Sequence, residues 1–229
     1  MLDIKNRETL EIYVLGDDFK FYQNLKYLPL TSYPSNNQSA LIIYCLGGKA
    51  KITVHEDVHW IQPEELIILL PGQFVSFSEP SEDFSTVTMV ISTSLFSDAL
   101  SGVPRFSPHF FFYMRKNFST PLYDEECQRF IHFCNILIFR INLPRNLFRR
   151  ESIMQLLRVF YWDIYVAYKR NPKAAELVKY TRKEKLLFDF FCLVIEFHTV
   201  SRDVAFYAKK MCVSAKHLTM VITDMSGRS

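Results

Sequence analysis

The stretch VAFYAKKMCVSAKHLTMVITDMSGRS, residues 204–229, contains two short runs with helical apolar spacing on either side of the tight link MCVS. If Ala208 is the small residue at which two helices cross, apolar side chains at set distances from it should face inward. These inward positions are Tyr207, Met211, Val213, Leu218 and Val221. The spacing predicts a helix-turn-helix, with Ser214 as the N-cap of its second helix and Gly227 near the end of that helix.

The predicted turn contains one departure from the motif, because Cys212 stands where glycine is commoner. An ordinary helical hairpin is the alternative. In the helix-turn-helix interpretation, residues 214–224 form a recognition helix that enters the major groove of DNA. Its outward residues would be Lys216, Thr219, Met220 and Thr223. Phosphate contacts, which position a protein without specifying a sequence, are expected from Arg202, Lys209 and Lys210.

The charge distribution is uneven along the chain, although the net charge is only +3. Residues 1–120 carry 9 basic and 13 acidic side chains, whereas residues 171–229 carry 10 basic and 6 acidic ones. The C-terminal excess of 10 − 6 = +4 favours a polyanionic partner such as DNA. A solvated helix surface would produce the same excess.

The N-terminal part, from about residue 10 to 92, has a period of two. In AKITV (50–54), Ala50, Ile52 and Val54 share one face, and STVTMVI (85–91) alternates in the same way. Turn signals such as GG at 47–48 and PG at 71–72 separate these runs. Many short strands with regular turns predict a sandwich or a small barrel.

The period changes to that of a helix after about residue 122. One apolar stripe runs from Cys127 to Ile141 and ends before Pro144, and a second runs from Ile153 to Tyr168 and ends at Asn171-Pro172. A short link makes the two helices antiparallel neighbours, and their wide apolar surface favours a homodimer interface over packing on the barrel alone. The expected interface residues are Phe130, Ile131, Cys134, Ile138, Leu157, Phe160, Tyr161 and Ile164.

Composition excludes several classes of protein. No segment approaches the ~18 uninterrupted apolar residues of a membrane span, and the charged N-terminus MLDIKNRETLEIYV does not resemble a secretory signal. Five cysteines without a CxxC indicate neither a disulfide framework nor a zinc ribbon. We therefore expect a cytoplasmic protein with no membrane partner.

The barrel offers little for catalysis. His55-Glu56 and His59 do not have the HxH spacing of a metal-binding cupin, and Phe74, Val75 and Phe77 stand where metal-binding relatives place a histidine. The remaining histidines are isolated, and no phosphate loop or nucleophile elbow is present. We expect no enzyme, no metal and no cofactor, but a pocket for an unidentified small-molecule effector.

The run RDVAFYAKKMCVSAKHLTMVITDMSGRS (202–229) resembles the first helix-turn-helix of AraC-type (AraC/XylS family) transcriptional regulators. The resemblance implies an α+β protein, with a cupin-like sensor barrel at 1–120, dimerisation helices at 121–171, a linker at 172–181 and a partial DNA-binding domain at 182–229. In that family a linker helix and a second helix-turn-helix follow. The chain is therefore expected to be truncated, with weak binding to double-stranded DNA.

The function implied by the resemblance is ligand-responsive regulation of transcription by a homodimer. Two alternatives stay open at this point. One is a metal-dependent cupin enzyme with an appended helical domain. The other is a truncated partner that dimerises without binding DNA.

Overall fold

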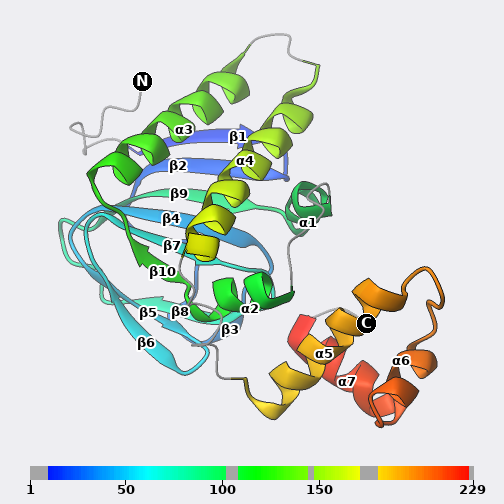
Figure 1. Ribbon diagram of the computed structural model, residues 1–229. Coiled ribbons are helices and arrows are strands. Elements are labelled where there is room, and N and C mark those ends of the chain that lie inside the picture. Colours follow the sequence, from blue (N-terminus) through cyan, green and yellow to red (C-terminus); the bar gives the residue numbers. More distant parts are fainter. Residues whose placement is uncertain (1–9, 102–107, 144–146, 171–179, 227–229) are drawn as a thin grey trace. The chain divides into compact units, whose positions relative to one another are not determined.

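The protein has the expected α+β class, with antiparallel sheets in its N-terminal part and helices in its C-terminal part (Figure 1). The computed structural model describes residues 10–101, 108–143, 147–170 and 180–226. These residues form two compact units. The barrel unit comprises residues up to 104 together with 117–166, and the helical unit comprises 105–116 together with 167–229.

Two antiparallel sheets build the barrel unit. The six-stranded sheet has the order β1 (Glu11–Leu15), β2 (Phe19–Leu25), β9 (Ser85–Ile91), β4 (Ala40–Gly47), β7 (Glu65–Leu69) and β10 (Ser119–Pro121). The four-stranded sheet has the order β3 (Ser35–Asn36), β8 (Phe74–Ser78), β5 (Ala50–Val54) and β6 (Asp57–Ile61). Every pairing is antiparallel, as expected for short strands joined by tight turns.

The predicted alternation is confirmed in β5, where Ala50, Ile52 and Val54 are buried and the residues between them are half-buried. In β9, by contrast, both faces are buried: Met89 on one side and Thr88 on the other are inaccessible to solvent. The reason is that helices cover one face of the six-stranded sheet, while the other face lines the barrel interior. The interior is filled mainly by aliphatic side chains of both sheets.

Three helices belong to the barrel unit in whole or in large part: α1 (Thr93–Ser101), α3 (Asp124–Asn142) and α4 (Arg149–Arg170). The last two match the predicted pair, and they lie across the six-stranded sheet (Figure 1). Arg150 of α4 bridges two carboxylates, with its Nε 2.6 Å from Asp18 and its Nη2 2.6 Å from Asp98. Aromatic rings also join the helices, since Phe133 and Phe160 stack with centroids 5.1 Å apart.

The helical unit contains α2 (Pro108–Lys116), α5 (Arg182–Phe197), α6 (Val204–Lys210) and α7 (Ala215–Ser226). The sequence pattern did not indicate that α2 would pack with α5, because α2 precedes the pair α3 and α4 in the chain. The linker expected at 172–181 lies almost wholly outside the described residues. Within the part of the chain that is described, no helix combines the length and hydropathy required to cross a bilayer.

Candidate nucleic-acid interface

The three helices α5, α6 and α7 pack around a small apolar core. Tyr207, Leu218 and Val221 are buried, and Met211 and Val213 are half-buried. All five positions predicted from the spacing therefore face inward. Ala208 is also buried, which is consistent with a methyl group at the place where α6 and α7 meet.

Both short helices have a capped N-terminus, and the cap of α7 is the one that the sequence predicts. The backbone N–H of His217 donates a hydrogen bond of 3.1 Å to the hydroxyl of Ser214, which is the N-cap of α7. Asp203 caps α6 in the same way by accepting 3.0 Å from the N–H of Ala205. Gly227, expected near the end of α7, lies outside the described residues.

The turn between α6 and α7 explains the departure at Cys212. This residue has a φ of 55°, in the left-handed region where a Cβ is strained and glycine is not. The N–H of Val213 donates 3.0 Å to the carbonyl of Ala208 and closes the turn. The backbone therefore adopts the conformation that favours glycine at this position, even though the side chain is a cysteine.

The outward face of α7 is polar apart from one methionine. Lys216, Thr219 and Met220 are exposed, and Thr223 is half-buried. His217 is exposed beside them in the first turn, and it was not among the predicted DNA-binding residues. Its place three residues before Met220 puts it on the same face, a signal that helical spacing alone could have supplied.

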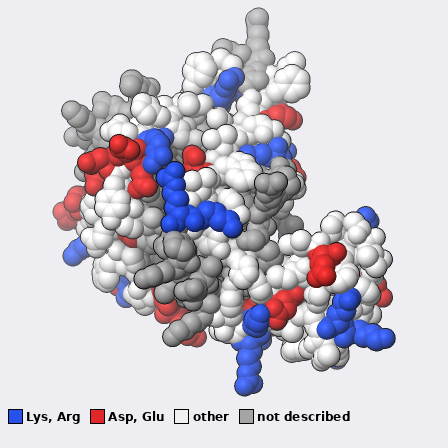
Figure 2. Space-filling model, in the orientation of Figure 1, with Lys and Arg blue, Asp and Glu red and all other residues white. Residues whose placement is uncertain are grey.

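The predicted phosphate contacts lie on and next to α6. Arg202, Lys209 and Lys210 are all exposed. The Nζ of Lys210 lies 4.0 Å from the ring centroid of Phe197, so part of its charge is directed at an aromatic face rather than away from the protein. Lys and Arg side chains are visible on the displayed face of the helical unit (Figure 2).

The predicted dimer interface requires a correction. Phe130, Cys134, Leu157, Phe160 and Tyr161 are buried within the single chain, for example by the contact of Phe130 with the Tyr44 ring at 5.2 Å. A partner subunit cannot reach these side chains while α3 and α4 remain packed on their own sheet. The apolar stripe was identified, but its neighbour is the barrel. Ile131, Ile138 and Ile164 are half-buried.

Other apolar side chains of the same two helices remain exposed. Phe139 of α3 is 61% exposed and Val159 of α4 is 56% exposed. Ile136, Trp162 and Val166 are exposed as well. Val159, Trp162 and Val166 follow one another at intervals of three and four residues, so they form one stripe along α4.

A polar cluster lies inside the barrel where edge strands β6 and β10 come together with β7. The carboxylate of Glu65 is buried, and its Oε1 lies 2.7 Å from Nε2 of His59. Ser119 donates a hydrogen bond to the same oxygen, and the N–H of Gln62 donates 2.8 Å to Oε2. The ring of Phe118 packs edge-on against His59 at 5.7 Å. Three strands contribute to this cluster, which the sequence did not reveal.

Among the described residues, no three His, Cys, Asp or Glu side chains come close enough to hold a metal ion. His55 lies in the turn after β5 and is exposed. Val75 and Phe77 fill the barrel interior, whereas Phe74 is exposed.

One part of the barrel-facing surface is not filled. Strand pairing places Ile12 beside Tyr22, and Val14 beside Lys20. Lys20 in turn pairs with Val90, which packs against the interior cluster, so all of these residues are on the barrel-facing side. Ile12 is 52% exposed and Val14 is 47% exposed. The side chains of β1 and β2 therefore leave an apolar surface with one cation at the open edge of the sheet.

Solved structures of transcription regulators resemble this chain over most of its length. ToxT K231A from Vibrio cholerae shares 10% identity over 96% of this chain and 75% of that chain, with a TM-score of 0.44. Wild-type ToxT with a bound unsaturated fatty acid shares 12% sequence identity over 96% of this chain and 74% of that chain, with a TM-score of 0.40. CuxR shares 12% sequence identity over 93% of this chain and 73% of that chain, with a TM-score of 0.42. CuxR is an AraC-like transcriptional activator. No family model and no curated protein matches the chain.

Proposed function

We propose that this protein is a transcriptional regulator of AraC type that binds double-stranded DNA through α7. The observation that carries the proposal is the α6–α7 turn, where the strained φ of Cys212 and the buried Ala208 reproduce the geometry expected of a helix-turn-helix. The exposed Lys216, Thr219 and Met220 are then presented to base edges in the major groove.

Basic residues around the motif support the same function. Lys209 and Arg202 are exposed at the two ends of α6, where they would contact phosphates on either side of the groove. Each such contact releases counterions from DNA, so affinity should fall with salt.

Salt titration tests the proposal. Binding of the protein to a fluorescent DNA duplex is followed by anisotropy at several salt concentrations. The plot of log affinity against log salt concentration has a negative slope, and Lys209→Gln should reduce the magnitude of this slope by about 0.9. Lys185→Gln is the matched control, because Lys185 lies on α5 and pairs with Asp189 at 2.7 Å. Equal slopes for both variants and wild type would remove α6 from the interface.

We propose that the barrel senses an organic acid with an apolar body. The supporting observation is the open surface of Ile12, Val14 and Tyr22 with the ammonium of Lys20 on the same face. Apolar contact would provide most of the affinity, and Lys20 would fix the acid group. Titration calorimetry with oleate tests this: Lys20→Gln should weaken binding several-fold, while Lys51→Gln, on the four-stranded sheet, should not.

We propose that the protein acts as a homodimer through the exposed faces of α3 and α4. Exposed apolar residues at helical spacing on two adjacent helices are the supporting feature. In this arrangement each protomer keeps its own helix pair packed on its own barrel. Dimerisation with no detectable DNA affinity would instead favour the alternative of a truncated partner that acts only by association.

A further inference from the structure

Helix α2 is held in the helical unit by aromatic contacts. The ring of His109 lies 4.4 Å from that of Phe188 on α5, and the ring of Phe112 lies 5.9 Å from the same partner. Phe111 contacts Phe191 of α5 edge-on at 6.4 Å. These rings line the middle of α5, the helix on which α6 and α7 pack.

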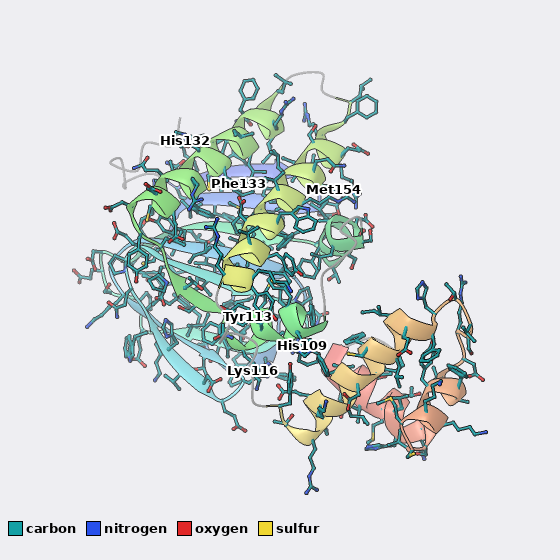
Figure 3. The ribbon with its side chains drawn as sticks, in the orientation of Figure 1. His109, Tyr113, Lys116, His132, Phe133 and Met154 are labelled. Atoms are coloured by element: carbon teal, nitrogen blue, oxygen red, sulfur yellow. The ribbon has the colours of Figure 1, made fainter. Side chains whose placement is uncertain are left out.

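An ion pair adds a polar tie at the end of α2. The Nζ of Lys116 lies 2.9 Å from Oε1 of Glu184, in the first turn of α5. Lys116 and His109 are labelled on α2 in Figure 3. Glu184 also forms a capping box with Thr181, accepting 2.7 Å from its backbone N–H. Burial favours a higher pKa for Glu184, but the Thr181 N–H and the Lys116 ammonium outweigh it and hold the pKa below its usual value.

The chain that follows α2 is held just as firmly in the barrel unit. Phe118 is buried in the barrel interior, and its carbonyl accepts 2.8 Å from the N–H of Ile68. Ser119 donates to Glu65, the central carboxylate of the polar cluster with His59. Residues 118 and 119 are therefore fixed by core packing, by a backbone hydrogen bond and by a side-chain hydrogen bond.

Only Asn117 lies between Lys116, which is paired with α5, and Phe118, which is buried in the barrel interior. A single residue spans at most ~3.6 Å, so this connection has almost no slack. A long polar linker would allow the barrel to rearrange without any effect on the helical unit. Here a displacement of Phe118 or Ser119 must either move α2 or break its contacts with α5.

We propose that α2 is the coupling element between the barrel and the DNA-binding helices, with the contact of Lys116 with Glu184 as its fastening point. The inference rests on the proposed function, because it specifies how the state of the barrel reaches α5. A ligand that changes the polar cluster or the position of Phe118 would shift the population of docked α2. Two anchored ends, not spatial proximity alone, are the physical basis of this coupling.

Amide hydrogen exchange of the free, full chain tests the coupling without ligand or DNA. Ser119→Ala removes one tie to Glu65 and leaves the fold of the barrel in place. In the wild-type background it should accelerate exchange in α5 by about threefold or more, besides its effect on β7 and β10. In a Lys116→Gln background the same change should still affect β7 and β10 but add less to exchange in α5, because only the aromatic contacts then hold α2 there.

Two further variants keep the test decisive. Glu184→Gln should reproduce the weaker coupling of Lys116→Gln, because each removes one side of the same ion pair. Ile91→Val, which deletes a buried methyl group from β9, is the control for general loosening of the barrel and should leave α5 unchanged. The proposal is overturned if Ser119→Ala does not alter α5, or if Ile91→Val alters it equally. Loss of DNA binding would affect neither result.

Discussion

The backbone N–H of Val213 donates a hydrogen bond of 3.0 Å to the carbonyl of Ala208, across a turn in which Cys212 has a φ of 55°. A residue with a Cβ in the left-handed conformation costs the folded state about 1–2 kcal/mol. Glycine avoids this cost, but it offsets part of the gain because it has a larger conformational entropy in the unfolded chain. Cys212→Gly should therefore raise the free energy of unfolding by about 0.5–1 kcal/mol. Urea denaturation measures the change.

Cys212→Ala separates the two possible sources of any gain. It removes the exposed thiol but keeps the Cβ, so it should leave stability unchanged to within about 0.5 kcal/mol. If alanine stabilises as much as glycine, backbone strain at this turn is not the cause.

The buried hydroxyl of Tyr161 predicts an unusual substitution effect. Tyr161 is fully buried, its hydroxyl has no hydrogen-bond partner among the described residues, and burial raises its pKa well above the usual value. Tyr161→Phe should thus raise the free energy of unfolding by about 1 kcal/mol. Tyr207 is the matched control, because its hydroxyl donates 2.5 Å to the carbonyl of Ser201. Tyr207→Phe should lower the free energy of unfolding by about 1 kcal/mol. If the two substitutions changed the free energy of unfolding equally, the hydrogen bond would not be the reason for the difference.

Acid should weaken the contact of Asp18 with α4. Hydrogen bonds from Ser92 and Arg150 hold the pKa of Asp18 below its ordinary value of 3.8. The ionised carboxylate therefore stabilises the fold at neutral pH, and this contribution is lost as the pH falls below 3.8 through the folded-state pKa. Asp18→Asn should lower the free energy of unfolding at pH 7 and leave it almost unchanged in strong acid. If Asp18→Asn remained less stable than wild type in strong acid, this explanation would be contradicted. Asp17→Asn is the control.

The proposed dimer interface on the exposed faces of α3 and α4 leads to a prediction about association. A carboxylate at Val159 would place a charge on the exposed stripe of α4 without entering the core. Val159→Glu should convert a dimer to a monomer in sedimentation velocity, with an unchanged circular dichroism spectrum. Val58→Glu, at an equally exposed apolar position on β6, is the matched control. A dimer that survives Val159→Glu but dissociates with Val58→Glu would place the interface on the barrel.

Local spacing predicted the helix-turn-helix because each of its constraints acts over a few residues. Tyr207, Leu218 and Val221 lie within two adjacent helices, so their burial follows from helical geometry once Ala208 is placed. The N-cap at Ser214 was predictable for the same reason. Cys212 also lies at the predicted turn position, with the positive φ that favours glycine there.

Relations between distant segments could not be predicted in this way. An apolar stripe such as that of Phe130 and Phe160 shows that a helix face is covered, but not whether a sheet or a second subunit covers it. The cluster of His59, Glu65 and Ser119 requires the register of three strands. The packing of α2 with α5 likewise depends on tertiary contacts between residues far apart in the chain.

The proposed reading of DNA by α7 is tested most directly by selection from a pool of randomised DNA duplexes. Wild-type protein and the double variant Lys216→Ala, Thr219→Ala are incubated with the pool at one fixed salt concentration, and the bound DNA is sequenced. The account predicts that the wild type enriches one sequence and that the folded variant loses this preference while retaining part of its non-specific affinity. No enrichment by the wild type, or the same enriched sequence with the variant, would contradict it.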